Sequence, residues 1–172
     1  QLWGNKYENS QKLKPYSPIK NNIKDFFDAG FRYNNSVSFN GATDKSEYYV
    51  SFSQISDDGM VPTDADSYDK YTFSARGSHK VKALTFSSSL NYSYQKNKFA
   101  TTGQGLTMLN SLYQTPRDVS IISLQDQNDI FNSPGYFYTP YGVMNPYYIL
   151  ENYLNEYDAE RFYGKFQVDY DF

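Results

Sequence analysis

The sequence predicts an all-β protein, namely a segment of an antiparallel transmembrane β-barrel with about five strands and one long extracellular loop. Three observations predict this class: apolar and polar residues alternate over long stretches, aromatic residues are abundant, and short and long connections alternate. Aromatic residues make up 19% of the 172 residues, with 19 Tyr and 13 Phe against one Trp. The mean hydropathy of −0.74 suits barrel strands, because each strand hides only alternate residues in lipid. No stretch approaches the roughly 18 apolar residues of a membrane-spanning helix.

Four strands are predicted within residues 31–95, because side-chain polarity there follows a period of two. The first covers 31–41, and a short turn at 42–45 leads to the second at 47–53. A longer connection at 56–68, rich in Asp, Gly and Pro, precedes the third strand at 70–78. A short turn at 79–82 precedes the fourth strand at 84–95, which alternates most regularly. One side of each strand is mainly Ser, Asn, Thr and Gln.

Residues 96–157 break the alternation, and four prolines and four glycines lie within them. Short helices are predicted near 106–113 and 147–154. A fifth strand follows at 158–172. The whole of 1–172 is thus expected to be part of a barrel, with an extracellular loop at 1–30, strands at 31–95, a long extracellular loop at 96–157 and a last strand at 158–172.

A barrel wall is favoured over a soluble sandwich by strand length and by the positions of the aromatic rings. The best strands alternate over about 11 residues, which is enough for a tilted strand to cross a bilayer. Short connections are typical of the periplasmic side and long ones of the outside. With this orientation, an outer aromatic girdle would contain Phe31, Tyr33, Tyr71, Tyr92, Tyr94 and Phe162. The inner girdle would contain Phe39, Tyr48, Tyr170 and Phe172.

The alternation also assigns side chains to lipid. The expected lipid-facing residues are Phe31, Tyr33, Val37, Phe39, Tyr71, Phe73, Leu84, Phe86, Leu90, Tyr92, Phe162, Phe166, Val168 and Tyr170. Five strands cannot close a barrel, since an open edge in lipid would leave backbone groups unpaired. The strands are therefore expected to be part of a larger wall.

Several segments resemble the SusC/RagA family of TonB-dependent outer-membrane transporters, in matching order along most of the chain. They are NNIKDFFDAG at 21–30, NNSVSFNG at 34–41, YYVSFS at 48–53, DGMVP at 58–62, YDKYTF at 68–73, QTPRD at 114–118 and PYGVMNPY at 140–147. The match corresponds to the middle of the family's barrel, without its plug domain or TonB box.

This resemblance implies a barrel of about 22 strands in the outer membrane of a Gram-negative bacterium of the Bacteroidetes type. It also implies active import of a glycan or peptide, energy from the TonB complex, and a SusD-like surface lipoprotein as partner. The residues themselves leave two alternatives open, a small complete outer-membrane barrel and a secreted, aromatic-rich, carbohydrate-binding β-sandwich.

No enzyme, cofactor or metal site is expected. The single histidine, His79, falls in a predicted turn without the partners of a catalytic triad. The acidic loop Asp57, Asp58, Asp64 and Asp66 lacks the spacing of a calcium loop. The net charge of −3 and the lack of a basic patch argue against nucleic-acid binding.

The long loop offers contact candidates for a substrate or for the partner lipoprotein. Tyrosine rings with polar tips suit stacking on sugars or packing against a protein. The candidates are Tyr136, Tyr138, Tyr141 and Tyr147. The alternative is that these rings pack the loop upon itself.

Overall fold

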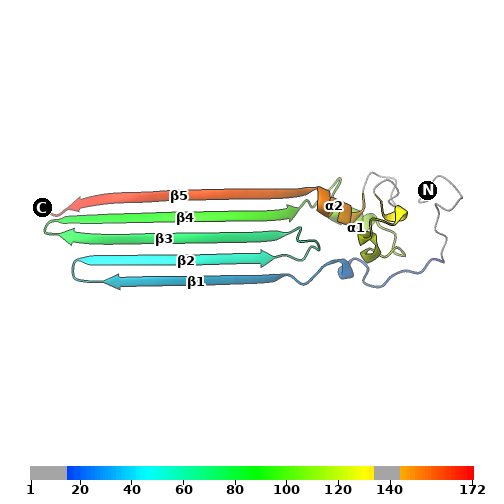
Figure 1. The fold of residues 1–172 in the computed structure, drawn as a ribbon, viewed down its shortest axis with the longest axis horizontal. Coiled ribbons are helices and arrows are strands. Elements are labelled where there is room, and N and C mark those ends of the chain that lie inside the picture. Colours follow the sequence, from blue (N-terminus) through cyan, green and yellow to red (C-terminus); the bar gives the residue numbers. More distant parts are fainter. Residues whose placement is uncertain (1–14, 134–143) are drawn as a thin grey trace. The chain divides into compact units, whose positions relative to one another are not determined.

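The computed structural model describes residues 15–133 and 144–172, and its main element is one antiparallel sheet of five strands in chain order (Figure 1). The all-β class is therefore confirmed. The strands are β1 (Phe31–Ala42), β2 (Ser46–Asp58), β3 (Ser67–Val81), β4 (Leu84–Ala100) and β5 (Leu154–Tyr170). The helices are α1 (Met108–Gln114) and α2 (Pro146–Asn152), with 3-10 turns η1 (Lys24–Phe26), η2 (Ile122–Gln125) and η3 (Ile130–Asn132).

The chain forms two compact units. The sheet unit comprises 31–58, 67–97 and 156–172. The loop unit comprises the described parts of three other stretches, 1–30, 59–66 and 98–155. Its segments thus come from the chain before β1, the β2–β3 connection and the β4–β5 connection.

The register of the sheet separates two faces. β1 pairs with β2 from Phe31–Asp58 to Ala42–Glu47, and β2 pairs with β3 from Ser46–His79 to Asp58–Ser67. Directly paired side chains share a face. The Ser74 hydroxyl donates to Asn91 Oδ1 at 2.7 Å, which extends the polar face to the odd-numbered residues of β4.

Two short turns hold this register. In the 43–45 turn, the Thr43 amide donates to the Ser46 carbonyl at 2.7 Å, and the Ser46 amide donates to Thr43 Oγ1 at 3.1 Å. Between β3 and β4 only Lys82 and Ala83 intervene, with Lys82 in the left-handed region at φ 56°. Tight hairpin turns of this kind fix which residues pair.

The strands are longer than their polarity predicts, which corrects the predicted loop bounds. β2 continues to Asp58, β4 to Ala100, and β5 begins at Leu154. The long connection is therefore 101–153, not 96–157, and the β2–β3 connection is 59–66, not 56–68. Polar side chains can extend a strand because the ladder uses backbone N–H and C=O groups. The predicted helices near 106–113 and 147–154 correspond to α1 and α2.

The loop unit has its own hydrophobic core. Phe26, Met108, Leu112, Leu124 and Ile149 are each at most 2% exposed. Both helices are capped at their first turn: the Asn110 amide donates to Thr107 Oγ1 at 3.3 Å, and the Tyr147 amide donates to Asn145 Oδ1 at 2.9 Å. Such caps satisfy backbone donors that the first turn leaves unpaired.

Candidate functional site: a two-faced sheet and a packed loop unit

One face of the sheet is apolar and uncovered. Phe31 is 68% exposed, Phe39 66%, Phe162 69% and Phe166 70%. In the described part of the chain, every buried hydrophobic residue belongs to the loop unit and none to the sheet unit. The sheet unit thus has large apolar side chains but no core that buries them. A water-soluble sheet is ordinarily packed on one face.

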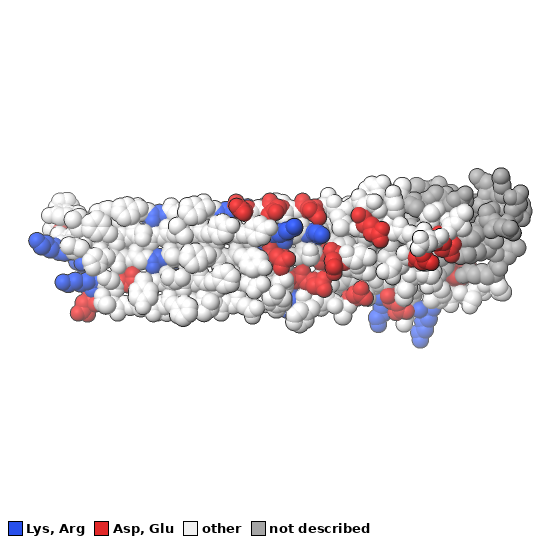
Figure 2. Space-filling view, viewed as in Figure 1, with Lys and Arg blue, Asp and Glu red and all other residues white. Residues whose placement is uncertain are grey.

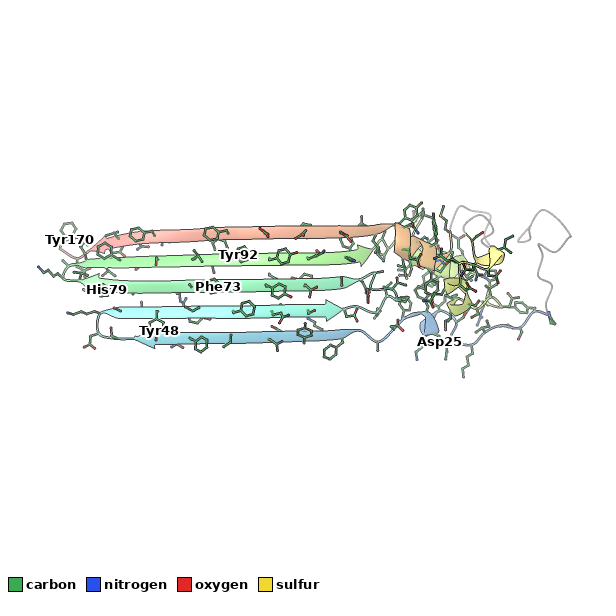
Figure 3. All side chains as sticks on the ribbon, in the orientation of Figure 1. Asp25, Tyr48, Phe73, His79, Tyr92 and Tyr170 are labelled. Atoms are coloured by element: carbon green, nitrogen blue, oxygen red, sulfur yellow. The ribbon has the colours of Figure 1, made fainter. Side chains whose placement is uncertain are left out.

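Aromatic rings of this face come from neighbouring strands, and Figure 3 labels Tyr48, Phe73, Tyr92 and Tyr170 on β2, β3, β4 and β5. Toward the long connections, the Tyr71 and Tyr94 rings stack with centroids 6.3 Å apart, and Phe52 lies 6.5 Å from Tyr71. At the short-turn end, the Tyr170 and Phe172 rings meet edge to face at 5.0 Å. Phe52, which pairs with Val37 and Phe73 on this face, is not among the predicted girdle residues.

Acidic residues follow the aromatic rows where the strands approach the long connections (Figure 2). The pairing places Asp58 and Asp69 on the same face as the aromatic rings. The Tyr94 hydroxyl donates to Asp158 Oδ2 at 3.4 Å, which puts Asp158 on that face too. Sequence analysis did not identify this band, because the predicted strands left out Asp58 and Asp69 and began the last strand only at Asp158. These acidic side chains therefore bound the apolar surface at the end of the strands near the long connections.

The opposite face is polar and contains a hollow of about 610 Å³ near the short turns. The small side chains of Ser78, Ser87 and Ser89 form part of its floor. Larger polar side chains, Tyr49, Arg76, Lys165 and Gln167, also line it. The Arg76 guanidinium lies 4.7 Å from the centre of the Tyr49 ring. Sequence analysis did not identify this site, because its lining comes from all five strands.

Two buried asparagines connect the segments of the loop unit on either side of 134–143. Asn145, 0% exposed, donates through Nδ2 to the carbonyls of Leu124 and Asn132, each at 2.7 Å. Asn132 donates through Nδ2 to the carbonyls of Ser123 and Asp126, each at 2.8 Å. These bonds hold the 3-10 turns η2 and η3 next to the start of α2.

The segment before β1 is tied to the long connection by a third asparagine. Asn22 donates through Nδ2 to the Val119 carbonyl at 2.6 Å and accepts from the Ile121 amide at 3.0 Å. The Ile19 amide donates to the Arg117 carbonyl at 2.8 Å. Segments about a hundred positions apart are therefore joined by side-chain and backbone bonds within one unit.

Of the predicted contact tyrosines, Tyr136, Tyr138 and Tyr141 lie outside the described residues. Tyr147 is 3% exposed and its ring packs at 5.1 Å from that of Phe26. It is a core residue of the loop unit, as the self-packing alternative predicts, and its ring offers no surface to a partner. Tyr113, 74% exposed, is an exposed aromatic side chain of α1 that the sequence reading did not single out.

Burial raises the pKa of the Tyr147 phenol, and the nearby Asp28 charge raises it further. We predict that the loop unit loses stability as the pH rises above about 10, the ordinary tyrosine pKa, because the exposed phenol of the opened unit ionises before the buried one. Hydrogen exchange of the α2 amides between about pH 9 and about pH 11 would measure this. Tyr147→Phe should flatten the dependence, whereas Tyr113→Phe should leave it unchanged; equal profiles would contradict the prediction.

The remaining polar candidates have local structural partners. His79 Nδ1 lies 2.6 Å from the Ser46 hydroxyl across the β2–β3 pair. Asp66 accepts from the Met60 and Val61 amides at 3.0 and 2.9 Å, so its carboxylate closes the 59–66 turn. Asp57 lies 3.4 Å from Arg32. Among the described residues, no group of three or more acidic, His or Cys side chains is placed to hold a metal ion.

Comparisons with known proteins return no matching family model and no matching curated protein. No helix within 15–133 and 144–172 is long and apolar enough to cross a membrane.

Proposed function

We propose that the apolar face of the sheet lies against the acyl chains of a bacterial outer membrane and that the chain forms part of the wall of a nutrient transporter. The observation that carries this proposal is a sheet unit without a buried core whose apolar face is broadly exposed. At about 25 cal/mol per Å² of apolar surface, so much uncovered aromatic area is costly in water. In lipid the same area is favourable.

The dimensions of the strands support this environment. They run from 12 to 17 residues, whereas a tilted strand needs about 9–11 to cross the hydrocarbon core. The acidic band occupies the excess at the end of the long connections. Charged side chains are tolerated there because they lie beyond the hydrocarbon, where the penalty for a charge falls steeply.

The open edges of the sheet are consistent with a wall that has further strands. Within the described residues, β1 pairs with β2 alone and β5 with β4 alone. Bacterial barrels have at least about eight strands, so the proposal requires further strands to pair with both edges. Neither alternative is supported by the described residues, since they supply five strands for a complete small barrel and one sheet for a sandwich.

The polar face would line the lumen, and the loop unit would be extracellular. The transporter would be of the TonB-dependent, SusC/RagA-like type, importing a glycan or peptide with a SusD-like lipoprotein, and its role would be transport, not catalysis. This assignment rests on the resemblance of the segments named above together with the two-faced sheet. The packed loop unit supports it because a preformed external surface suits capture of a ligand or partner.

Spin labelling tests the placement of the faces. The sequence has no cysteine, so single cysteines can be introduced at Leu84, Phe86, Leu90 and Tyr92, and at Thr85, Ser87, Ser89 and Asn91 as matched controls. The full-length protein is then studied in lipid vesicles. Oxygen dissolved in the lipid should speed the relaxation of spin labels at the first set of positions. A water-soluble nickel reagent should speed the relaxation of labels at the second set. Equal accessibility of the two sets, or the reverse pattern, would refute the proposal.

A further inference from the structure

We infer that the apolar face, where it ends at the short turns, holds the phosphate headgroup of a phospholipid whose acyl chains lie along the same face. The inference rests on the proposed function, which places this face in a membrane, and it adds a particular lipid as partner. It starts from a difference between the two ends of the face. Asp58, Asp69 and Asp158 end it near the long connections, whereas His79 ends it near the short turns.

The register brings His79 and Ser46 together on the apolar face. They pair across β2 and β3, next to the Tyr48–Gly77 pair on the same face. The Ser46 hydroxyl and His79 Nδ1 lie 2.6 Å apart in an exposed position, at the short-turn end of the sheet (Figure 3). His79 Nε2 has no hydrogen-bond partner within residues 15–133 and 144–172. When the Ser46 hydroxyl donates to Nδ1, or when the ring is protonated, Nε2 carries a proton that a phosphate oxygen can accept.

Two lysines of the short turns add positive charge beside this pair. Lys45 belongs to the 43–45 turn, and its carbonyl accepts from the Lys80 amide at 2.8 Å, which joins this turn to the end of β3. Lys82 lies in the following turn. Among the described residues neither Lys45 nor Lys82 forms an ion pair, and Asp44 is the one acidic residue of the two turns. Long lysine side chains can bring the ammonium group to headgroup level while their stems lie on apolar surface.

The acidic residues of the strand ends here lie on the polar face, away from His79. Asp171 forms an ion pair with Lys80 at 2.8 Å, and Lys80 points to the polar face because it adjoins His79 along the strand. The Ser78 hydroxyl donates to the Glu47 carboxylate at 3.0 Å on that face. The acidic residues of this group are Glu47, Asp169 and Asp171. An anionic headgroup is therefore the complementary partner for this end of the apolar face.

Beside His79 the apolar face has open space for an acyl chain. Gly77 is the next residue of β3 on this face, and Tyr48 lies opposite it on β2. The Tyr48 ring leans away over β1, since a Cβ at Gly41 would overlap it. A Cβ at Gly77 would have no described side chain within 4 Å, its two chain neighbours left aside. The alignment of β3 with β4 described above sets the small Ser88 on the other side of Gly77. A phospholipid with its phosphate at His79 can therefore lay a chain over Gly77.

Lipid binding to the full-length protein in detergent, measured by native mass spectrometry, tests the inference. The probes are phosphatidylglycerol, a diacylglycerol with the same acyl chains, and glycerol 3-phosphate. They represent the whole lipid, its chains alone and its phosphate alone. Phosphatidylglycerol should bind at least about tenfold more tightly than the diacylglycerol, the effect of one charge-assisted hydrogen bond. Added salt should reduce this difference, and glycerol 3-phosphate should not displace the lipid.

Two variants separate the headgroup from the chain. His79→Leu should weaken phosphatidylglycerol binding about tenfold and leave diacylglycerol binding unchanged. Ser88→Phe, which fills the space beside Gly77, should weaken the binding of both lipids. The controls are Lys24→Gln, which removes a positive charge from the loop unit, and Val37→Phe, which adds a ring to the apolar face on β1. Both controls should bind phosphatidylglycerol as the wild type does.

Equal binding of phosphatidylglycerol and diacylglycerol, or unchanged phosphatidylglycerol binding in His79→Leu, would overturn the inference. Displacement by glycerol 3-phosphate at equal concentration would overturn it too, because it would show a site for phosphate without the lipid. Unchanged binding in Ser88→Phe would overturn the placement of the chain. The spin labels report whether the face lies in lipid, whatever the headgroup at its end. A failure here with the spin-label pattern intact would therefore leave the proposed function standing.

Discussion

Replacing Leu90 by arginine should destabilise the full-length protein in lipid vesicles by about 2–4 kcal/mol, the cost of an arginine near the bilayer midplane. Leu90 lies on the apolar face of β4, between Leu84 and the Tyr94 ring that stacks on Tyr71. The guanidinium would have to enter the hydrocarbon or bend toward a headgroup region on either side. The midpoint of guanidinium-induced unfolding, followed by tryptophan fluorescence, measures the loss.

Ser89→Arg is the matched control. Ser89 is the adjacent residue on the same strand but lines the hollow on the polar face. An arginine side chain there would be solvated and would have space. We expect this variant to unfold within about 0.5 kcal/mol of the wild type, as surface substitutions usually do. Two variants of equal stability would show that the apolar face does not lie in lipid. A larger loss for Ser89→Arg would show that the faces are reversed.

The two faces of the sheet could be predicted because alternation is a local property of the sequence. A residue and its second neighbour share a face in any strand, so Phe31, Tyr33 and Val37 group together before any pairing is known. The β1–β2 and β2–β3 registers then bring these groups together on one side. Turn residues such as Lys82 limit the possible registers further.

The strand ends could not be predicted with the same accuracy. Ser56 and Asp58 continue β2 on the apolar face, but neither is apolar, so the polarity signal stops before the ladder does. Hydrogen bonding along the ladder depends on the backbone and is insensitive to this change. The acidic band is therefore visible only after Asp58 and Asp69 are seen on neighbouring strands.

The loop unit and the hollow depend on contacts between distant segments. Asn22 bonds to backbone groups at Val119 and Ile121, and no periodic pattern marks an asparagine for such a role. The sequence predicts a surface contact for Tyr147 because tyrosine often lies at interfaces. Its burial follows from α2, whose Tyr147, Ile149 and Leu150 are all at most 3% exposed.

Asn145→Ala should lower the free energy of opening of the loop unit by about 3 kcal/mol. The substitution removes the two hydrogen bonds that the Asn145 side chain donates to the carbonyls of Leu124 and Asn132. Both carbonyls then lose this donor inside the unit. It also removes the side-chain cap at the Tyr147 amide, a loss that by itself costs about 1 kcal/mol. Asn145 makes all three contacts from a fully buried position, with 0% of its surface exposed.

Hydrogen exchange in the full-length protein separates this effect from a general loss of stability. Amides of α1 and α2 should exchange about a hundredfold faster in Asn145→Ala, since about 1.4 kcal/mol corresponds to a factor of ten. Amides of β2 and β3 should be unchanged, because those strands belong to the sheet unit. Asn152→Ala, which removes one exposed bond to the Tyr148 carbonyl, should leave both sets as they are. If Asn145→Ala accelerated exchange in the sheet as strongly as in the helices, the two units would open together, and the loop unit could not act as a separately folded external surface.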